Sequence, residues 1–262
     1  MTREKMILGA IAGDVIGSVY EWHNVKSMNF NLFSPKSTFT DDSVLTIATM
    51  DVLINKEDYA EVYQKYGRKY FGKGYGSNFR SWIYSNNPKP YNSWGNGSAM
   101  RVSPVGWFCT NMEDVLQEAK RSAEVTHNHP EGIKGAQAAA SAVFLARNGK
   151  TKNEIKDFIT GTFNYDLERS IDEIRPDYNF VVSCQGSVPE AIIAFLESTD
   201  YENAIRLAVS IGGDSDTIAC ITGGIAEAFY GKIPDNIIDN VSGILTTELK
   251  NIIKIFSEKY GK

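Results

Sequence analysis

Two short segments of this 262-residue chain concentrate oxygen ligands at points where helices are expected to begin. One segment is Thr40-Asp41-Asp42-Ser43, and the other is Asp214-Ser215-Asp216-Thr217, which follows two glycines. An apolar run that predicts a helix comes after each of them. Carboxylates and hydroxyls are the ligands that Mg²⁺ and Mn²⁺ prefer, whereas Zn²⁺ favours His and Cys. If the two segments meet in space, they predict a site for divalent cations.

Helix capping is an alternative explanation of the same residues. An oxygen at a helix start accepts unpaired backbone N–H groups and interacts well with the positive end of the helix dipole. One aspartate per helix is enough for that purpose, and here each start carries two together with a hydroxyl. Neighbouring carboxylates repel each other and raise each other's pKa unless a cation lies between them. Spacing alone supports the two explanations about equally.

A predicted helix from Lys5 to Trp22 carries a further acidic pair and a stripe of glycines. Asp14 and Glu21 are seven positions apart, about two helical turns, so they are expected to share a face of this helix. Glu21 then either faces the acidic site or marks the solvated end of the helix. Glycines at every fourth position would let another helix approach closely; they are Gly9, Gly13 and Gly17.

The segment Gly95-Asn96-Gly97-Ser98-Ala99-Met100-Arg101 has the residue types of an anion-binding turn. Its first three residues tolerate positive φ, and successive amides in such a turn can form a nest for an anion. It is neither a Walker motif nor a dinucleotide fingerprint. Arg101 is expected either to support the turn or to contact a phosphate. His127 lies in another turn, where it is either a structural hydrogen-bonding group or a residue that faces the site.

Bulk composition restricts the class of protein. The net charge of −5 argues against broad nucleic-acid binding. Three cysteines cannot all pair within one chain and have no zinc-site spacing with the histidines, which favours a reducing compartment. The N-terminal stretch is too polar for a secretion signal or a membrane span. We therefore expect a soluble, cytoplasmic protein that forms a single domain over residues 1–262.

Helical periodicity accounts for nearly every regular segment, and alternating strand patterns are missing. The predicted fold is an all-α bundle with a crevice formed by loops at helix starts. Asp42–Ile54 is expected to be a central helix, and Tyr165–Arg175 a further charged helix. Residues 72–97 form an irregular aromatic loop, which either stacks on a base or packs against itself.

Read together, five segments resemble the ADP-ribosylglycohydrolases, the group that includes the dinitrogenase-reductase-activating glycohydrolases. The resemblance runs from about Leu8 to about Gly231, and the order of the segments carries it. The segments are Gly13-Asp14-Val15-Ile16-Gly17 with Glu21; Thr40-Asp41-Asp42-Ser43; Gly95-Asn96-Gly97-Ser98-Ala99-Met100-Arg101; Thr126-His127-Asn128-His129-Pro130-Glu131-Gly132; and Gly212-Gly213-Asp214-Ser215-Asp216-Thr217.

The resemblance implies an orthogonal all-α fold that holds two divalent cations, Mg²⁺ or Mn²⁺. The implied metal ligands are Thr40, Asp41, Asp42, Asp214, Asp216, Thr217 and Glu21. The implied substrate-binding residues are Asn96, Gly97, Ser98, Met100, Arg101 and His127. Asp214 and Glu21 are the two candidates for the catalytic general base.

The implied activity is hydrolysis of the glycosidic bond at the anomeric carbon of ADP-ribose. Cleavage there builds oxocarbenium character, and two cations can orient the ribose hydroxyls and lower the pKa of a water. The expected substrate is an ADP-ribosylated protein side chain, with arginine as the first choice, or a small ADP-ribosyl metabolite. We expect a monomer that does not associate with membranes.

Three other classes of function remain open at this point. The chain could bind ADP-ribose or a related nucleotide without cleaving it, as a sensor or as an immunity protein against a toxin. It could transfer a sugar nucleotide, although such enzymes usually need an α/β sheet. It could also be a helical structural protein whose aspartates are only helix caps, in which case Mg²⁺ or Mn²⁺ would not raise its melting temperature.

Overall fold

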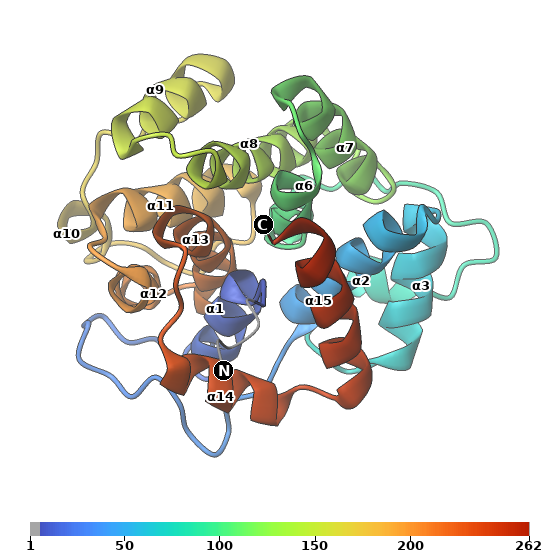
Figure 1. Cartoon of the computed structure of the whole chain (residues 1–262), viewed down its shortest axis with the longest axis horizontal. Coiled ribbons are helices and arrows are strands. Elements are labelled where there is room, and N and C mark those ends of the chain that lie inside the picture. Colours follow the sequence, from blue (N-terminus) through green and yellow to red (C-terminus); the bar gives the residue numbers. More distant parts are fainter. Residues whose placement is uncertain (1–5, 262) are drawn as a thin grey trace.

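The computed structural model describes residues 6–261 and consists of helices joined by loops (Figure 1). Within that range it contains no strand, only an isolated bridge between Gly95 and Ser183. The all-α prediction is therefore confirmed. In chain order the helices are α1 (Gly9–Gly17), α2 (Asp41–Asn55), α3 (Tyr59–Lys69), α4 (Ser77–Trp82), α5 (Gly97–Met100), α6 (Ser103–Phe108), α7 (Met112–Glu124), α8 (Pro130–Arg147), α9 (Lys152–Phe163), α10 (Ile171–Ile174), α11 (Cys184–Glu197), α12 (Tyr201–Ile211), α13 (Ser215–Tyr230), α14 (Asp235–Ile244) and α15 (Thr247–Tyr260).

Helix α13 lies at the centre of the bundle. Every residue from Ser215 to Ala228 is buried, so the helix has no solvated face. A helix that is apolar or small on all sides is stable only when neighbours surround it. Its neighbours include α1, α8, α11 and α12, and Figure 1 shows α1, α11 and α12 around it. The N-terminal end of α13, which carries the second acidic segment, is thereby fixed inside the fold.

Helices α1 and α13 approach each other more closely than side chains would allow. A Cβ atom added to Gly13 would lie 2.0 Å from the carbonyl oxygen of Ala219. The carboxylate of Glu227 in α13 accepts the backbone N–H groups of Leu8 and Gly9 at 3.1 and 2.7 Å, which fixes the start of α1. The glycines predicted from the sequence to permit close helix packing thus lie where α1 contacts α13.

The first predicted helix is shorter than expected. Its predicted first residue, Lys5, lies outside the described residues, and α1 ends at Gly17. The prediction that the helix extends to Trp22 and carries Glu21 is wrong. The chain turns after Gly17, and the side chain of Asn24 exchanges hydrogen bonds with the backbone of Gly213 at 2.8 and 3.0 Å. Contacts with the start of α13 therefore replace continuation of the helix.

The predicted charged helix over residues 165–175 is largely absent. Only Ile171–Ile174 is helical there, and it begins at a capping box formed by Ser170 and Glu173. The Asp166 side chain accepts the N–H of Glu168 at 3.0 Å, a local hydrogen bond that competes with helix formation.

The aromatic loop over residues 72–97 contains the short helix α4, which the sequence analysis did not predict. Phe79 stacks on Tyr75 and Trp82 with ring centroids 5.2 and 5.4 Å apart, and all three rings are buried. This part of the loop packs against the protein itself. Trp94, at its C-terminal end, is exposed.

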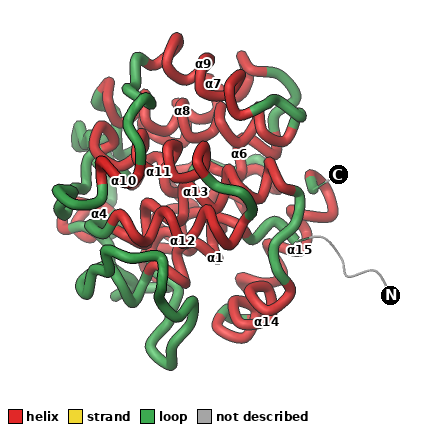
Figure 2. Tube along the Cα trace, turned by 90° about the vertical axis from the view of Figure 1, so that its left-hand side faces the viewer, coloured by secondary structure: helices red, strands yellow, loops and turns green. Residues whose placement is uncertain are grey.

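Most loop segments gather on the side of the molecule that carries α4 and α10 (Figure 2). The acidic segments lie at the loop-to-helix junctions before α2 and α13. In the described part of the chain, none of the helices combines the length and the apolar character needed to span a bilayer.

Candidate active site

The starts of α2 and α13 meet, as the two acidic segments predicted. The hydroxyl of Thr217 donates to Asp42, whose two carboxylate oxygens both lie 3.1 Å from it, across 175 positions of sequence. Two overlapping groups of carboxylates have ligand atoms within 4.8 Å of one another. The groups are Asp14, Asp42 and Asp216, and Glu21, Asp214 and Asp216.

Capping does not explain Asp214 or Asp42, whereas Asp216 accepts the first-turn N–H of Thr217 at 3.0 Å. Asp214 occupies the N-cap position of α13, yet its side chain makes no capping hydrogen bond. It accepts the side-chain amide of Asn96 at 2.7 Å instead. The only hydrogen bonds to the Asp42 carboxylate within residues 6–261 come from the hydroxyls of Thr217 and Thr40. Thr40 itself is a true N-cap, because its side chain accepts the N–H of Asp42 at 3.3 Å.

Asp14 is a member of the site that sequence reasoning missed. Its Oδ2 accepts the backbone N–H groups of Thr40 at 2.9 Å and Ser43 at 3.1 Å, and also the Ser43 hydroxyl. Its Oδ1 accepts the Thr40 hydroxyl at 2.7 Å. A buried carboxylate from α1 therefore fixes the first turn of α2. The signal was an aspartate between the closely packed glycines Gly13 and Gly17, but only the fold shows where it points.

A positive charge among these aspartates would stabilise their ionised forms. Burial, followed by the charge of neighbouring carboxylates, raises the pKa of Asp41, Asp42 and Asp216 well above the ordinary value. Burial also raises the pKa of Asp14 and Asp214, against hydrogen bonds that lower it. Within residues 6–261, no lysine or arginine forms an ion pair with these aspartates. Hard oxygen donors lacking a counter-ion fit divalent cations such as Mg²⁺ or Mn²⁺.

Glu21 lies at the edge of this cluster, on the loop after α1. It is partly buried, and burial together with the negative charge of Asp214 raises its pKa to about 7. The adjoining Trp22 is exposed and stacks on Phe180, with ring centroids 5.0 Å apart. Both rings and Glu21 border the same pocket. The carboxylate of Glu21 therefore belongs to a loop held from two sides, by Asn24 and by Phe180.

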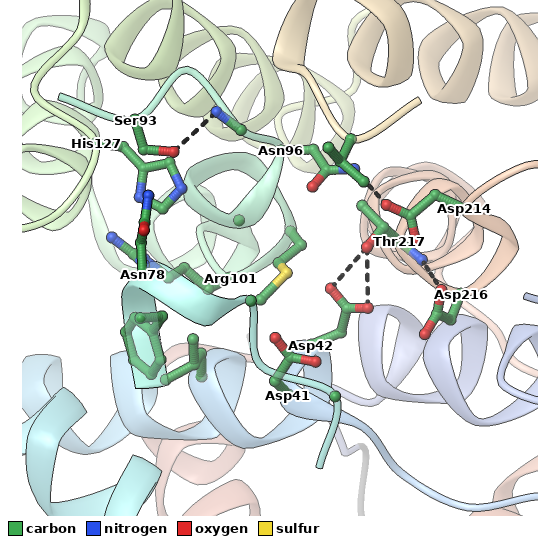
Figure 3. A pocket seen from close by; sticks show the side chains of 18 of the residues that line it. Asp41, Asp42, Asn78, Ser93, Asn96, Arg101, His127, Asp214, Asp216 and Thr217 are labelled. Atoms are coloured by element: carbon green, nitrogen blue, oxygen red, sulfur yellow. Dashed lines mark hydrogen bonds between the residues drawn. The ribbon is translucent and has the colours of Figure 1, made fainter. Parts of the chain in front are cut away.

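The acidic cluster opens into a pocket of about 420 Å³, a volume within the range of small-ligand sites. Figure 3 shows the aspartates and Thr217 on one side of it and His127, Arg101 and Asn78 on the other. Of the predicted metal ligands, all but Thr40 line the pocket. Thr40 lies directly behind them, bonded to Asp14.

Five of the six predicted substrate-binding residues line the pocket: Asn96, Gly97, Met100, Arg101 and His127. Ser98 does not; its side chain is buried, and its hydroxyl donates to the carbonyl oxygen of Gly132 at 2.7 Å.

The turn that carries these residues is built differently from the predicted nest. Neither Gly95 nor Gly97 has a positive φ, and Asn96 is the N-cap of the short helix α5. The loop is held by the Asn96 N–H, which donates to the carbonyl of Val182 at 2.8 Å. Gly97 leaves room for the His127 ring, because a Cβ on Gly97 would make a tight contact of 3.2 Å with Nε2 of His127.

Comparisons with known proteins agree with the geometry of the site. A family model described as ADP-ribosylglycohydrolase matches residues 4–262. The chain is 28% identical to the ADP-ribosylhydrolase ARH3 of Homo sapiens, over 93% of this chain and 90% of that protein. It is 27% identical to ARH3 of Mus musculus, over 96% and 91% respectively. It is 26% identical to the ADP-ribosylarginine hydrolase Tri1 of Pseudomonas putida, over 86% of this chain and 69% of that protein.

The fold is shared with a solved structure described as an ADP-ribosylglycohydrolase-related protein complex. The TM-score is 0.75 at 23% identity, with 96% of this chain and 95% of that chain covered. Because a family model covers nearly the whole sequence and the helical architecture agrees with it, this chain belongs to the ADP-ribosylglycohydrolase family.

Proposed function

We propose that this protein is a hydrolase, dependent on divalent cations, that cleaves the glycosidic bond at the anomeric carbon of ADP-ribose. One observation carries the proposal: buried carboxylates from two helix starts converge, without a cationic partner among residues 6–261, on a pocket of about 420 Å³. Family membership makes ADP-ribosylated molecules the expected substrates. The functional unit in this proposal is the single domain of residues 1–262.

Two cations, Mg²⁺ or Mn²⁺, complete the site in this proposal. Their expected ligands are Thr40, Asp41, Asp42, Asp214, Asp216, Thr217 and Glu21. When bound, the cations supply the positive charge that neutralises the cluster and polarises oxygen atoms of the ligand. Asp14 supports these ligands from behind, since it holds Thr40 and Ser43 through four hydrogen bonds.

A carboxylate at the pocket edge acts as general base toward the attacking water. Glu21 suits this role because its carboxylate borders the pocket and lies within 4.8 Å of the Asp214 and Asp216 carboxylates. Asp214 is the second candidate, since it is held in place by Asn96. The base takes a proton from water as the water oxygen bonds to the anomeric carbon. The bond from that carbon to the leaving group breaks, and the leaving group departs with the electron pair.

The opposite side of the pocket binds the rest of ADP-ribose. Its expected contacts are Asn96, Gly97, Met100, Arg101 and His127, and the buried Ser98 supports the turn behind them through Gly132. Our first choice of leaving group is an arginine side chain. The name of the relative Tri1, an ADP-ribosylarginine hydrolase, supports this choice. Serine-linked proteins and small conjugates such as O-acetyl-ADP-ribose are the alternatives. A cytoplasmic monomer is part of the proposal, consistent with three buried cysteines that are all free thiols.

The deciding experiment measures ADP-ribose release from an arginine-ADP-ribosylated protein with Mg²⁺, with Mn²⁺ and with chelator. Serine-linked and O-acetylated substrates run in parallel. Release that depends on the cation, and that Asp214→Asn abolishes, supports the hydrolase and identifies its linkage. Full activity of Asp214→Asn at saturating cation would remove Asp214 from the catalytic residues.

The rival function is a module that binds ADP-ribose or a nucleotide without cleaving it, as a sensor or toxin-immunity protein. Tight ADP-ribose binding by calorimetry, with no release from any of the three substrates, would favour this rival.

A further inference from the structure

A chain of four buried side chains runs behind the pocket wall formed by His127. The guanidinium of Arg101 lies 4.4 Å from the ring centroid of Tyr63 and is fully buried. Its Nη2 donates to the carbonyl of Ser122 at 2.7 Å and to the hydroxyl oxygen of Thr126 at 2.9 Å. Oγ1 of Thr126 is in turn 2.7 Å from Nδ1 of His127.

Counting donors and acceptors along this chain favours one direction for each hydrogen bond. A guanidinium has only donors, so Thr126 must accept from Arg101. Thr126 then has one O–H left to donate. The groups that can accept this O–H are Nδ1 of His127 at 2.7 Å, the carbonyl of Ala123 at 3.5 Å and the hydroxyl of Tyr91. The contact with Nδ1 of His127 has the length of a good hydrogen bond, whereas the contact with Ala123 is at the limit.

We infer that Arg101 and Thr126 are positioning residues that hold His127 as the neutral tautomer with its proton on Nε2. An Nδ1 that accepts from Thr126 cannot carry a hydrogen, so a neutral ring must carry it on Nε2. In this arrangement Arg101 acts on the ligand through Thr126 and His127, with the Nη2 that donates to Thr126.

The charge of Arg101 favours the same state of the ring. Burial first, and the positive charge of Arg101 second, hold the pKa of His127 well below its ordinary value. Tyr91 also packs near this ring, with centroids 6.0 Å apart, and its pKa is raised to about 12 by burial, so it stays neutral too. Among residues 6–261, Arg101 is the charged group that acts on the ring, and its positive charge opposes an imidazolium.

Nε2 of His127 is left as a free donor at the pocket. It makes no hydrogen bond within residues 6–261, and it lies beside Gly95 and Gly97. An oxygen acceptor of the ligand, from a phosphate or a ribose, fits a neutral N–H at this point. This assignment of a ligand contact rests on the proposed function, whereas the tautomer itself does not.

The tautomer can be measured directly on the intact protein by NMR. The chain has three histidines, so labelling with ring-¹⁵N histidine gives three ring systems. Loss of one system in His127→Gln identifies the signals of His127. We expect a protonated Nε2 and a bare Nδ1 in the wild-type protein. A protonated Nδ1 in the wild type would overturn the inference, whatever the protein binds.

Two substitutions then test the positioning role. Thr126→Val removes the hydroxyl with little change of shape, and Thr126→Ser keeps it. We expect the valine variant to lose the single Nε2–H tautomer and to bind free ADP-ribose about three- to tenfold more weakly, as for one lost neutral hydrogen bond. The serine variant should match the wild type in both measurements. Thr222→Val, which removes another buried hydroxyl bonded to Ala191, is the matched control and should change neither.

The outcomes separate this inference from the proposed function. An unchanged tautomer and unchanged affinity in Thr126→Val would overturn the positioning role. If that variant does not fold, the wild-type spectrum and Thr126→Ser still decide: a serine variant that differs from the wild type in tautomer overturns it as well. Failure of the wild type to bind ADP-ribose, with the Nε2–H tautomer present, would count against the proposed function and leave the tautomer assignment standing.

Discussion

The side-chain amide of Asn96 donates a hydrogen bond of 2.7 Å to Oδ2 of Asp214, across 118 positions of sequence. The same amide donates to the hydroxyl of Ser187 at 3.1 Å. This contact joins the two sides of the pocket, because Asn96 belongs to the turn before α5 and Asp214 to the start of α13. The orientation of the Asp214 carboxylate therefore depends on the loop expected to bind substrate.

Asn96→Asp replaces this donor with a second carboxylate. Two like charges within hydrogen-bond distance repel each other, so we expect a loss of about 1–3 kcal/mol in the free energy of unfolding at pH 7.5. The loss should shrink at pH 5, where one of the two carboxyls is expected to take up a proton. Urea unfolding at both pH values measures this. Asn240→Asp, on the exposed surface of α14, is the control and should be nearly neutral. Equal stability of Asn96→Asp and the wild type at pH 7.5 would contradict the prediction.

Asp14→Asn tests the carboxylate behind the first turn of α2. An amide cannot accept all four hydrogen bonds from Thr40 and Ser43, and its NH₂ group would face donors. We expect a loss of about 1–3 kcal/mol in stability and a fall in Mn²⁺ affinity of roughly 10- to 100-fold, typical of groups that orient metal ligands. Calorimetric titration with Mn²⁺ measures the second effect.

Asp51→Asn provides the matched control for this experiment. Like Asp14 of α1, Asp51 of α2 is a buried carboxylate. It accepts the Tyr66 hydroxyl at 2.9 Å and the Asn55 amide at 2.7 Å. Its substitution should lower stability and leave Mn²⁺ affinity unchanged. A similar affinity loss in both variants would mean that Asp14 acts only through general stability.

The pH dependence of stability should differ between the cation-free and the cation-bound protein. Glu21 has a pKa raised from 4.5 to about 7 by folding, so between these values the native state holds a proton that the unfolded state has released. Stability from such a group is present below pH 4.5 and falls as the pH rises toward 7. The melting temperature in chelator should therefore drop between pH 5 and 7.5. Burial raises the pKa of Asp42 and Asp216 in the same direction.

Divalent cations should reverse this loss. Saturating Mg²⁺ or Mn²⁺ at about 100 times the dissociation constant adds roughly 2.7 kcal/mol, which corresponds to a rise of about 5–10 °C for a chain of this size. Differential scanning fluorimetry at pH 7.5 checks the rise, and Asp42→Asn should remove most of it. No rise with either cation would favour the interpretation of these aspartates as structural groups.

Gly13→Ala tests the close contact between α1 and α13. The added Cβ would meet the carbonyl of Ala219 at 2.0 Å, and backbone on both sides prevents easy adjustment. We expect a loss of about 1–3 kcal/mol or more and a weaker cation site, since α1 carries Asp14. Gly161→Ala in α9, where nothing lies within 4 Å of the new atom, should be neutral or stabilising by up to about 1 kcal/mol. Chemical denaturation of the two variants side by side gives the comparison.

The sequence by itself determined the helical class, the helix that begins near Asp42 and the residues that could bind cations. Helical periodicity and caps are local properties, which is why α7 begins after the N-cap Asn111 and α9 after the N-cap Thr151. The two acidic segments were recognisable because each concentrates oxygen ligands within four positions. The order of five short motifs was enough to indicate the family.

Only the tertiary structure decided which of these groups face one another. Asp14 and Ser98 lie in the predicted motifs, yet the first supports α2 and the second bonds to Gly132 behind the pocket wall. Glu21 lies in a loop and not in the predicted helix, because the following segment is bonded to the start of α13 through Asn24 and Gly213. Such choices depend on contacts between residues that are 26, 34 and 189 positions apart in the sequence. Sequence periodicity carries no information on these contacts, because they form only when packing brings particular helix faces together.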